Sequence, residues 1–301
     1  IARLVSERRR SSVMGILAAG SYAGLVLGLA GGAAIAGMWG WRWAFLALAI
    51  PGLPIALLIS LAAPRDPPRP QSTAGGAISM VAAFRICFAT PSLRLLAIGM
   101  GTFNVFAYAA ALWLPAYFIR SHGMSMMEAG AWMGFGAATG GILGSLLSGV
   151  IVDALRGRSE VWQVRLPALA LLLSFPLFAI NLLLPGGIAI ELASLHLPLV
   201  ALINCLTTFL SALWAGPSFA AAARVVTPEL RAQATALLII ITNVLGPSLG
   251  PVIAGLVSDA FASRFGADSI RYSLLFISLF TVVGGAIFWR AGHYYPADIK
   301  Q

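Results

Sequence analysis

The chain has 301 residues, of which 59% are hydrophobic and only 10% are charged, and its mean hydropathy is +0.91. Soluble domains carry about 25% charged residues, so this composition excludes a soluble globular protein and indicates an integral membrane protein. The formal net charge of +9 is not read as a nucleic-acid signal, because the basic residues fall between apolar stretches, as membrane topology requires.

Eight apolar stretches are each long enough to cross a bilayer core of about 30 Å, which takes roughly 20 helical residues. Alternating, strand-like patterning is absent, so the sequence predicts an all-α membrane bundle rather than a β-barrel. The predicted spans are residues 13–38, 42–63, 93–118, 127–152, 163–184, 198–223, 233–258 and 270–291.

The basic residues are unequally divided between the two sides of this predicted bundle. Fifteen of the 19 Lys and Arg residues lie on the side of the N-terminus, and four lie on the other: Arg42, Arg120, Arg264 and Arg271. Cytoplasmic loops carry the excess of positive charge. The sequence therefore predicts that both chain ends are cytoplasmic, in what we expect to be a bacterial inner membrane.

Glycine recurs every four residues in the first span, within "GSYAGLVLGLAGG" at residues 20–32. In a water-exposed helix each Gly costs roughly 1 kcal/mol relative to Ala, whereas in lipid small residues at this spacing let helices approach closely. We expect such glycines to form packing surfaces, and whether these surfaces slide or are static stays open. They are Gly20, Gly24, Gly28 and Gly32, then Gly136, Gly140 and Gly144, then Gly246 and Gly250.

A Pro-rich run, "PRDPPRPQSTAGG", starts at residue 64 and cannot continue a helix. It predicts three parts: residues 1–63 with two spans, a cytoplasmic central loop at 64–92, and residues 93–301 with six spans. A shift of 222 residues aligns Glu7 with Glu229, Arg9 with Arg231, Gly24 with Gly246 and Gly28 with Gly250. The first two spans thus look like a repeat of the last two, and internal repeats are typical of transporters.

These segments resemble the major facilitator superfamily over essentially the whole chain. The first two spans, with "GWRWAF" between them, are similar to helices five and six of that superfamily, and Gly15, Gly24, Gly28 and Gly32 approximate its glycine motif, with Leu29 in place of Pro. "GVIVDALRGR" resembles the loop between the second and third helices of each half. "FAYAAALWLPAYFIRSHGMS" and "TPELRAQATALLIIITNVLGPSLGPVIAGLVSD" look most like the spinster group. The resemblance implies a twelve-helix bundle of which eight helices are present here, the first four being absent.

The resemblance also implies that the first and fourth helices of each six-helix unit contact the substrate. These are the third and sixth spans, and polar residues within spans are costly and suggest function. For each residue alone, an interhelical hydrogen bond is the alternative. The candidates are Asn104, Tyr108 and Trp113 in the third span, Asn204, Thr207, Thr208 and Trp214 in the sixth, and Tyr22 and Asn243 from flanking helices.

Asp153 lies at the end of the fourth span, where the helix dipole disfavours an isolated carboxylate. The resemblance places its loop, which carries Arg156 and Arg158, beside the start of the first span. We expect a latch between Asp153 and Arg9 or Arg10 that holds the cytoplasmic side closed; the alternative is a solvated charge worth under about 1 kcal/mol. By the repeat, Glu229 and Arg231 face the corresponding loop of the absent half.

The expected function is secondary active transport of a small organic or amphiphilic solute by alternating access, without cofactor or metal. A sugar, an organic anion or a drug is the alternative cargo. No acidic residue lies in the middle of a span, so a carboxylate for proton coupling belongs to the absent helices. No G-x-S-x-G or H-E-x-x-H pattern supports an intramembrane enzyme, and a non-transporting scaffold remains a weaker alternative. We expect these 301 residues alone not to transport, because a cavity without four of its helices is open to lipid.

Overall fold

The computed structural model describes residues 10–28, 35, 38–62, 84–85, 88–192, 195–228 and 230–299. Almost all of them are helical. In chain order the elements are α1 (Arg10–Val26), α3 (Trp41–Ala49), α4 (Gly52–Ala62), α6 (Pro91–His122), α7 (Met126–Gly136), the π-helix η3 (Ala137–Gly141), α8 (Ile142–Leu155), α9 (Trp162–Leu183), β1 (Ala189–Leu192), β2 (Leu195–Pro198), α10 (Leu199–Ala212), α11 (Ala215–Ala222), α12 (Arg231–Phe265), the 3-10 helix η4 (Gly266–Asp268) and α13 (Ser269–Asp298).

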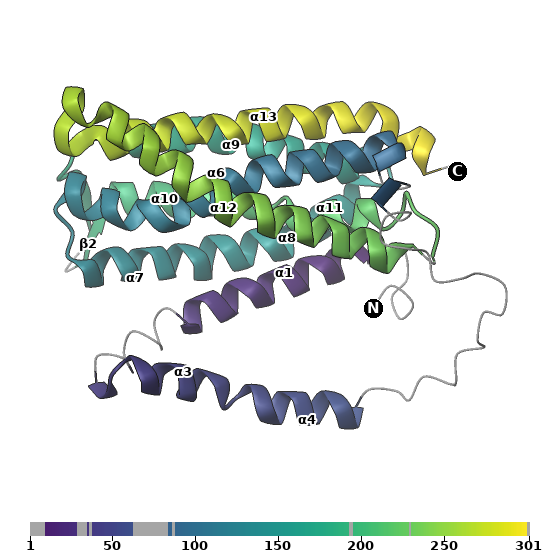
Figure 1. Cartoon of the computed structure of the whole chain (residues 1–301), viewed down its shortest axis with the longest axis horizontal. Coiled ribbons are helices and arrows are strands. Elements are labelled where there is room, and N and C mark those ends of the chain that lie inside the picture. Colours follow the sequence, from purple (N-terminus) through teal and green to yellow (C-terminus); the bar gives the residue numbers. More distant parts are fainter. Residues whose placement is uncertain are drawn as a thin grey trace.

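The long helix α6 is the centre of the bundle (Figure 1). Helices α12 and α13 pack along α6, α9 packs against α13, and α1 packs along α8. Segment α3–α4 lies apart from the bundle, and nearly all its side chains are exposed. The buried core is therefore built around α6, with Phe106, Phe118 and Phe178 among its large side chains.

The ends of α6 follow from local sequence. Pro91 at the first turn needs no N–H partner, and the N–H of Ser92 donates to Oδ2 of Asp298 at 2.9 Å, which ties α6 to the end of α13. Gly123 ends the helix at φ 66°, a left-handed conformation that only Gly adopts without strain. Ser125 and Glu128 then form a capping box that starts α7.

Six described stretches are long and apolar enough to cross a membrane, and the last of them, Arg231–Asp298, holds both α12 and α13. Helix α1 has 17 described residues. The chain is thus an integral membrane protein by length and composition of its helices. The count of eight spans out of twelve, and the division at residues 63 and 92, stay predictions.

The all-α prediction was incomplete. Strands β1 and β2 pair antiparallel, with Ile190 opposite Leu197. Four residues per strand are too few for alternation to stand out beside long apolar helices, so the sequence gives no usable signal for this hairpin.

Two predicted spans contain an irregular turn. The π-helix η3, which contains Gly140 and Gly141, separates α7 from α8, and Gly tolerates the unusual backbone. The sixth span breaks at Leu213–Trp214 between α10 and α11. Pro217 explains this break. It has no N–H, so it cannot donate the helical hydrogen bond to the carbonyl of Leu213, four residues earlier.

Candidate functional site

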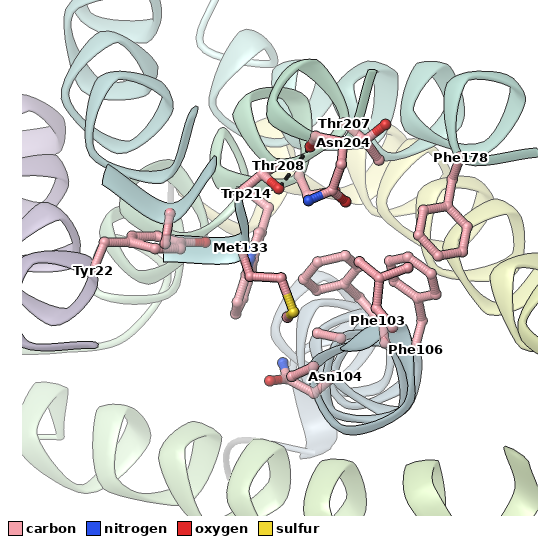
Figure 2. Close-up of a pocket in the computed structure, with 16 residues that line it drawn as sticks. Tyr22, Phe103, Asn104, Phe106, Met133, Phe178, Asn204, Thr207, Thr208 and Trp214 are labelled. Atoms are coloured by element: carbon pink, nitrogen blue, oxygen red, sulfur yellow. Dashed lines mark hydrogen bonds between the residues drawn. The ribbon is translucent and has the colours of Figure 1, made fainter. Parts of the chain in front are cut away.

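A cavity of about 280 Å³ opens where α6, η3, α9 and α10–α11 face one another, with α1 at its edge (Figure 2). Its size is close to the lower end of small-molecule sites. The lining residues are Tyr22, Phe103, Asn104, Phe106, Ala107, Ala110, Ala111, Leu114, Met133, Ala137, Phe178, Asn204, Thr207, Thr208, Ser211 and Trp214.

Helix α10 supplies the polar side of this cavity. The hydroxyls of Thr207 and Thr208 donate to the carbonyls of Ile203 at 2.9 Å and Asn204 at 2.8 Å, so their oxygen lone pairs stay available to accept. The Asn204 amide is 6% exposed and has no hydrogen-bond partner within the described part of the chain. This side can therefore both donate to and accept from a bound molecule.

Helix α6 supplies an apolar side opposite α10, as Figure 2 shows. Phe106 meets Phe178 edge to face at a centroid distance of 4.9 Å, and Phe103 lies 5.3 Å from Trp214. Such aromatic pairs add about 0.5–1.5 kcal/mol beyond area burial. The Asn104 amide turns back to donate to the carbonyl of Met100 at 2.8 Å.

Tyr22 reaches the cavity from α1 because Gly141 of η3 has no side chain in its way. A Cβ built on Gly141 would lie 2.6 Å from Cε1 of Tyr22, so the tyrosine ring rests against bare backbone. π-helical turns are frequent at functional sites. The contact joins α1 to the cavity wall formed by Ala137.

Six of the nine predicted cavity residues line this space: Tyr22, Asn104, Asn204, Thr207, Thr208 and Trp214. The other three lie at the contact of α6 with α12. The Tyr108 hydroxyl donates to Oδ1 of Asn243 at 3.4 Å, and Nε1 of Trp113 donates to the carbonyl of Pro251 at 3.1 Å. A role of any of these residues in binding stays a prediction.

The sequence interpretation missed the apolar lining, notably Phe103, Phe106, Met133 and Phe178. The predicted cavity residues were Asn, Thr, Tyr and Trp, all of which carry a polar group, and included no Phe or Met. The available signal was spacing, because Phe103, Phe106, Ala107, Ala110 and Leu114 recur at three and four residues and so share one face of α6.

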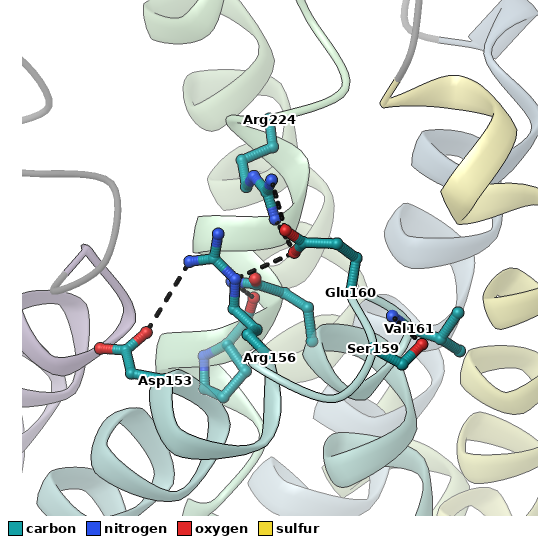
Figure 3. A network of polar contacts seen from close by, with 8 residues as sticks. Asp153, Arg156, Ser159, Glu160, Val161 and Arg224 are labelled. Atoms are coloured by element: carbon teal, nitrogen blue, oxygen red, sulfur yellow. Dashed lines mark hydrogen bonds and ion pairs between the residues drawn. The ribbon is translucent and has the colours of Figure 1, made fainter.

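A second polar feature is a charge network at the end of α8 (Figure 3). Nε of Arg156 donates to Oε2 of Glu160 at 3.0 Å, and Nη1 of Arg156 lies 3.9 Å from Oδ1 of Asp153. Arg224, just past α11, binds the same glutamate with both terminal nitrogens, Nη2 reaching Oε1 at 3.2 Å. Glu160 thus joins the α8–α9 connection to the end of α11.

The two arginines change the acidity of Glu160. Hydrogen bonding from Arg224, with a smaller contribution from Arg156, outweighs desolvation and lowers the pKa of the Glu160 carboxyl from 4.5 to about 2. The glutamate is therefore charged at any physiological pH. Its side chain remains 43% exposed, so solvent screens part of the attraction.

The predicted latch is only partly within the described residues. Asp153 pairs with Arg156 of its own loop; Arg9, Glu229 and the Arg10 side chain lie outside the described set. Arg158 is exposed. Arg231 donates from Nε to the carbonyl of Ala223 at 2.9 Å. Pairing of Asp153 with Arg9 or Arg10 stays a prediction.

The glycine positions differ in how tightly they pack. A Cβ on Gly140 or Gly144 would overlap α10 at the carbonyl of Cys205 or Phe209, and one on Gly250 would lie 3.0 Å from the Ala109 nitrogen of α6. A Cβ on Gly136 would be in ordinary contact, and one on Gly246 would lie 2.6 Å from the Tyr108 ring. By contrast, a Cβ on Gly20, Gly24 or Gly28 meets no described atom within 4 Å, and Gly32 lies outside the described residues.

Comparison with known proteins connects this geometry to a family. The model of the Major Facilitator Superfamily matches residues 1–194. The chain belongs to this superfamily. The resemblance drawn from its sequence motifs is confirmed, and the family is one of membrane transporters rather than enzymes.

Two curated relatives align with nearly all of this superfamily member. The chain is 28% identical over 308 residues to an MFS-type efflux pump of Mycolicibacterium smegmatis. This alignment covers 100% of this chain and 68% of that protein. The chain is also 29% identical over 299 residues to Protein spinster homolog 3 of Danio rerio. That alignment covers 91% of this chain and 58% of the relative. The superfamily member described here thus spans about two thirds of these proteins or less.

Solved structures show the same fold. A bacterial homolog of the human lysosomal transporter spinster, inward-facing and unoccupied, matches with a TM-score of 0.64 and 21% identity over 92% of this chain and 67% of that one. Its inward-facing occupied form matches with a TM-score of 0.62 over 92% and 66%. The superfamily member therefore has the fold of these spinster structures.

Proposed function

We propose that this chain forms the solute-binding half of a secondary active transporter that moves a small organic or amphiphilic solute by alternating access. The observation that carries the proposal is the cavity between α6 and α10–α11. One side of it is aromatic, and the other offers the amide of Asn204 and the hydroxyls of Thr207, Thr208 and Ser211. Small-molecule sites combine apolar walls with a few polar groups in this way.

The charge of the lining narrows the solute. None of the 16 lining residues has a formally charged side chain. A charged group placed there without a partner would lose its hydration at high cost. The part of the solute held by this half is therefore uncharged, which favours the acyl or aromatic part of an amphiphile over an organic anion.

Two classes of solute are candidates for the cargo. The resemblance of the sequence motifs to the spinster group implies an amphiphilic, lipid-like solute, whereas similarity to an MFS-type efflux pump of M. smegmatis supports export of the solute, with a drug as the second candidate cargo. An uncharged aromatic cavity suits both. If protons drive transport, the titrating carboxylate lies outside the residues that line this cavity.

Binding to the purified chain tests the proposal. A fluorescent single-chain phospholipid analogue should bind saturably, and glucose should not displace it. Asn204→Leu and Trp214→Ala should each weaken binding about tenfold, or 1.4 kcal/mol, because they remove the free amide or the aromatic wall.

Tyr108→Phe is the matched control, since Tyr108 is also a polar aromatic residue on α6 but contacts Asn243 rather than the cavity. It should bind like the unaltered chain. If Tyr108→Phe weakened binding equally, or if Asn204→Leu and Trp214→Ala left binding unchanged, the solute would not bind in this cavity.

A further inference from the structure

A second pocket lies at the end of the bundle where α7 begins and β2 runs (Figure 1). Its volume is about 150 Å³, and it shares no lining residue with the cavity between α6 and α10–α11. We call it the hairpin pocket, because the base of the β1–β2 hairpin forms one of its walls. The residues that line it are His122, Gly123, Met124, Glu128, Trp132, Gly187, Ile188, Pro198 and Val200.

The hairpin pocket is negatively charged, whereas the lining of the larger cavity is uncharged. With His122 neutral, Glu128 carries the one formal charge among its described lining residues, none of which is Lys or Arg. Glu128 and Trp132 are four residues apart on α7 and so share a face of that helix. Met124 and Val200 add buried apolar surface.

Glu128 keeps its charge and most of its capacity to accept hydrogen bonds while it caps α7. Its Oε2 accepts the N–H of Ser125 at 2.8 Å, and the Ser125 hydroxyl accepts the N–H of Glu128 at 3.2 Å. A carboxylate has two oxygens with about four lone-pair sites, and the capping bond uses one of them. The capping box therefore positions the carboxylate without neutralising it.

The hydrogen bonds of Tyr117 identify the acceptor that His122 offers. The single hydroxyl proton of Tyr117 is donated to the carbonyls of Asn181 and Leu182, at 2.9 and 3.0 Å. Nε2 of His122, 2.8 Å from the same hydroxyl oxygen, must then be the donor in that contact. A neutral imidazole protonated at Nε2 has its lone pair at Nδ1. His122 can therefore accept a hydrogen bond at Nδ1.

The helix ends around the hairpin pocket favour a cation over an anion. The capping box engages donors at the start of α7, and the N–H of Leu199, at the start of α10, donates to the carbonyl of Ile188 at 3.0 Å. Helix α6 ends here at His122, and the C-terminal end of a helix dipole attracts positive charge. The guanidinium of Arg271, close enough to act on His122, is paired with Asp268, its Nη2 lying 3.5 Å from Oδ1.

We propose that the hairpin pocket binds the ammonium group of a small organic amine. Glu128 and Nδ1 of His122 accept its N–H donors, the Trp132 ring lies beside the charge, and Met124 and Val200 contact its alkyl part. Hydrogen bonds between charged groups are about twice as strong as neutral ones, and an indole ring attracts a cation through its quadrupole.

The size and the side chains of the pocket select this ligand among cations. A volume of about 150 Å³ admits a short alkylammonium and is below the roughly 300 Å³ at which sites for drug-sized ligands begin. The pocket has two metal-ligating side chains, His122 and Glu128, and no group of three or more occurs in the described part of the chain. The apolar surface would be left uncovered by an inorganic cation.

Ligand-observed NMR of the purified chain tests the site, with propylammonium chloride as the probe. 1-Propanol is the neutral comparison with the same number of non-hydrogen atoms, and sodium chloride at equal concentration is the inorganic one. Propylammonium should bind saturably, 1-propanol should bind at least about tenfold more weakly, and sodium should not displace the probe. Equal binding of 1-propanol, or displacement by sodium, would overturn the assignment to an ammonium group.

Glu128→Gln separates ligand binding from helix capping. Glutamine at this position keeps the capping box but removes the charge, so the thermal unfolding of the chain should change little while the dissociation constant of propylammonium rises at least about tenfold. Trp132→Leu should raise it about two- to fivefold, as loss of a cation–π contact near solvent does. Unchanged binding in Glu128→Gln would overturn the proposal.

Three variants serve as controls. Ser125→Ala removes the capping hydroxyl but keeps the N–H that holds Glu128, and Glu191→Gln removes a carboxylate of β1 that does not line the pocket; both should bind propylammonium like the unaltered chain. Asn204→Leu, in the larger cavity, should also leave this binding unchanged, so the two proposals can fail separately. Equal weakening by Glu191→Gln, or loss of propylammonium binding in Asn204→Leu, would overturn the hairpin pocket as the site.

Discussion

At the scale of single residues, Glu160 joins two segments of the chain through its carboxylate. It is shared by Arg156, four residues away, and by Arg224, 64 residues away. We predict that Glu160→Gln lowers the free energy of unfolding at neutral pH by about 1 kcal/mol, the upper range for a partly exposed pair. Thermal unfolding in detergent measures it, with Arg158→Gln as the control on the same loop.

The same prediction has a pH dependence. The folded-state pKa of Glu160 is lowered to about 2 from an ordinary 4.5, so its contribution is complete above pH 4.5 and is lost as the pH falls toward 2. The difference between the unaltered chain and Glu160→Gln should shrink over that window. A difference that stays constant, or grows, on acidification would show that Glu160 does not stabilise the fold through its charge.

Residue roles were only partly predictable. The sequence drew attention to Asp153 and Arg156, because they match a family loop, but not to Glu160 and Arg224. Their pairing depends on how the α8–α9 connection meets the end of α11, which no local pattern reports. The polar cavity residues were found because a polar side chain in a span is costly.

At the scale of elements, close helix contact decides which glycines matter. Gly140 faces α10 so closely that a Cβ would lie 2.9 Å from the Phe209 nitrogen, whereas a Cβ on Gly134, in α7, meets no described atom within 4 Å. We predict that Gly140→Ala destabilises the protein by about 1–3 kcal/mol, as overpacking does, and that Gly134→Ala is neutral or stabilising by up to about 1 kcal/mol.

Thermal unfolding of the two variants measures this contrast. Gly24→Ala is a third arm, because its Cβ also has open space in this chain, and it should behave like Gly134→Ala. Equal melting of the Gly140 and Gly134 variants would mean that α10 moves away at little cost, and the proposed tight contact of η3 with α10 would be wrong.

The glycine pattern was visible in the sequence for all of these positions, but its consequence was not. Regular spacing identifies a helix face that can be approached. Whether another helix approaches it depends on the tertiary arrangement, which brings α10 to Gly140 and Gly144 and α6 to Gly250.

At the scale of the whole molecule, the unequal division of basic residues predicts the orientation in the membrane. A cysteine at position 158, in the Arg158→Cys variant, should react with an impermeant thiol reagent only from the cytoplasmic side. A cysteine from Met126→Cys, which is 84% exposed, should react only from the other side. Both variants are made after Cys87 and Cys205 are replaced by Ala.

Labelling of intact cells and of inverted vesicles gives the two readouts. Reaction of both cysteines from one side would contradict the predicted topology, since α7, η3 and α8 separate these positions by a continuous helical rod. Reversed labelling would keep the fold but place the charge network on the outer side.

The sequence by itself determined that this protein lies in a lipid bilayer and that it is built from membrane-spanning helices. Long apolar runs, few charges and the positions of the basic loops follow from the cost of placing polar groups in lipid, and this cost acts on each segment separately. The family motifs are local in the same sense.

Only the tertiary structure decided which residues of different helices meet. It placed Asn204 opposite Phe106 around the cavity, turned Tyr108 and Trp113 toward α12 instead, and joined Glu160 to Arg224. In a chain that is apolar almost all round, hydrophobicity does not distinguish one helix face from another. The choice of partners therefore rests on shape, on close contact at glycines and on a few polar pairs.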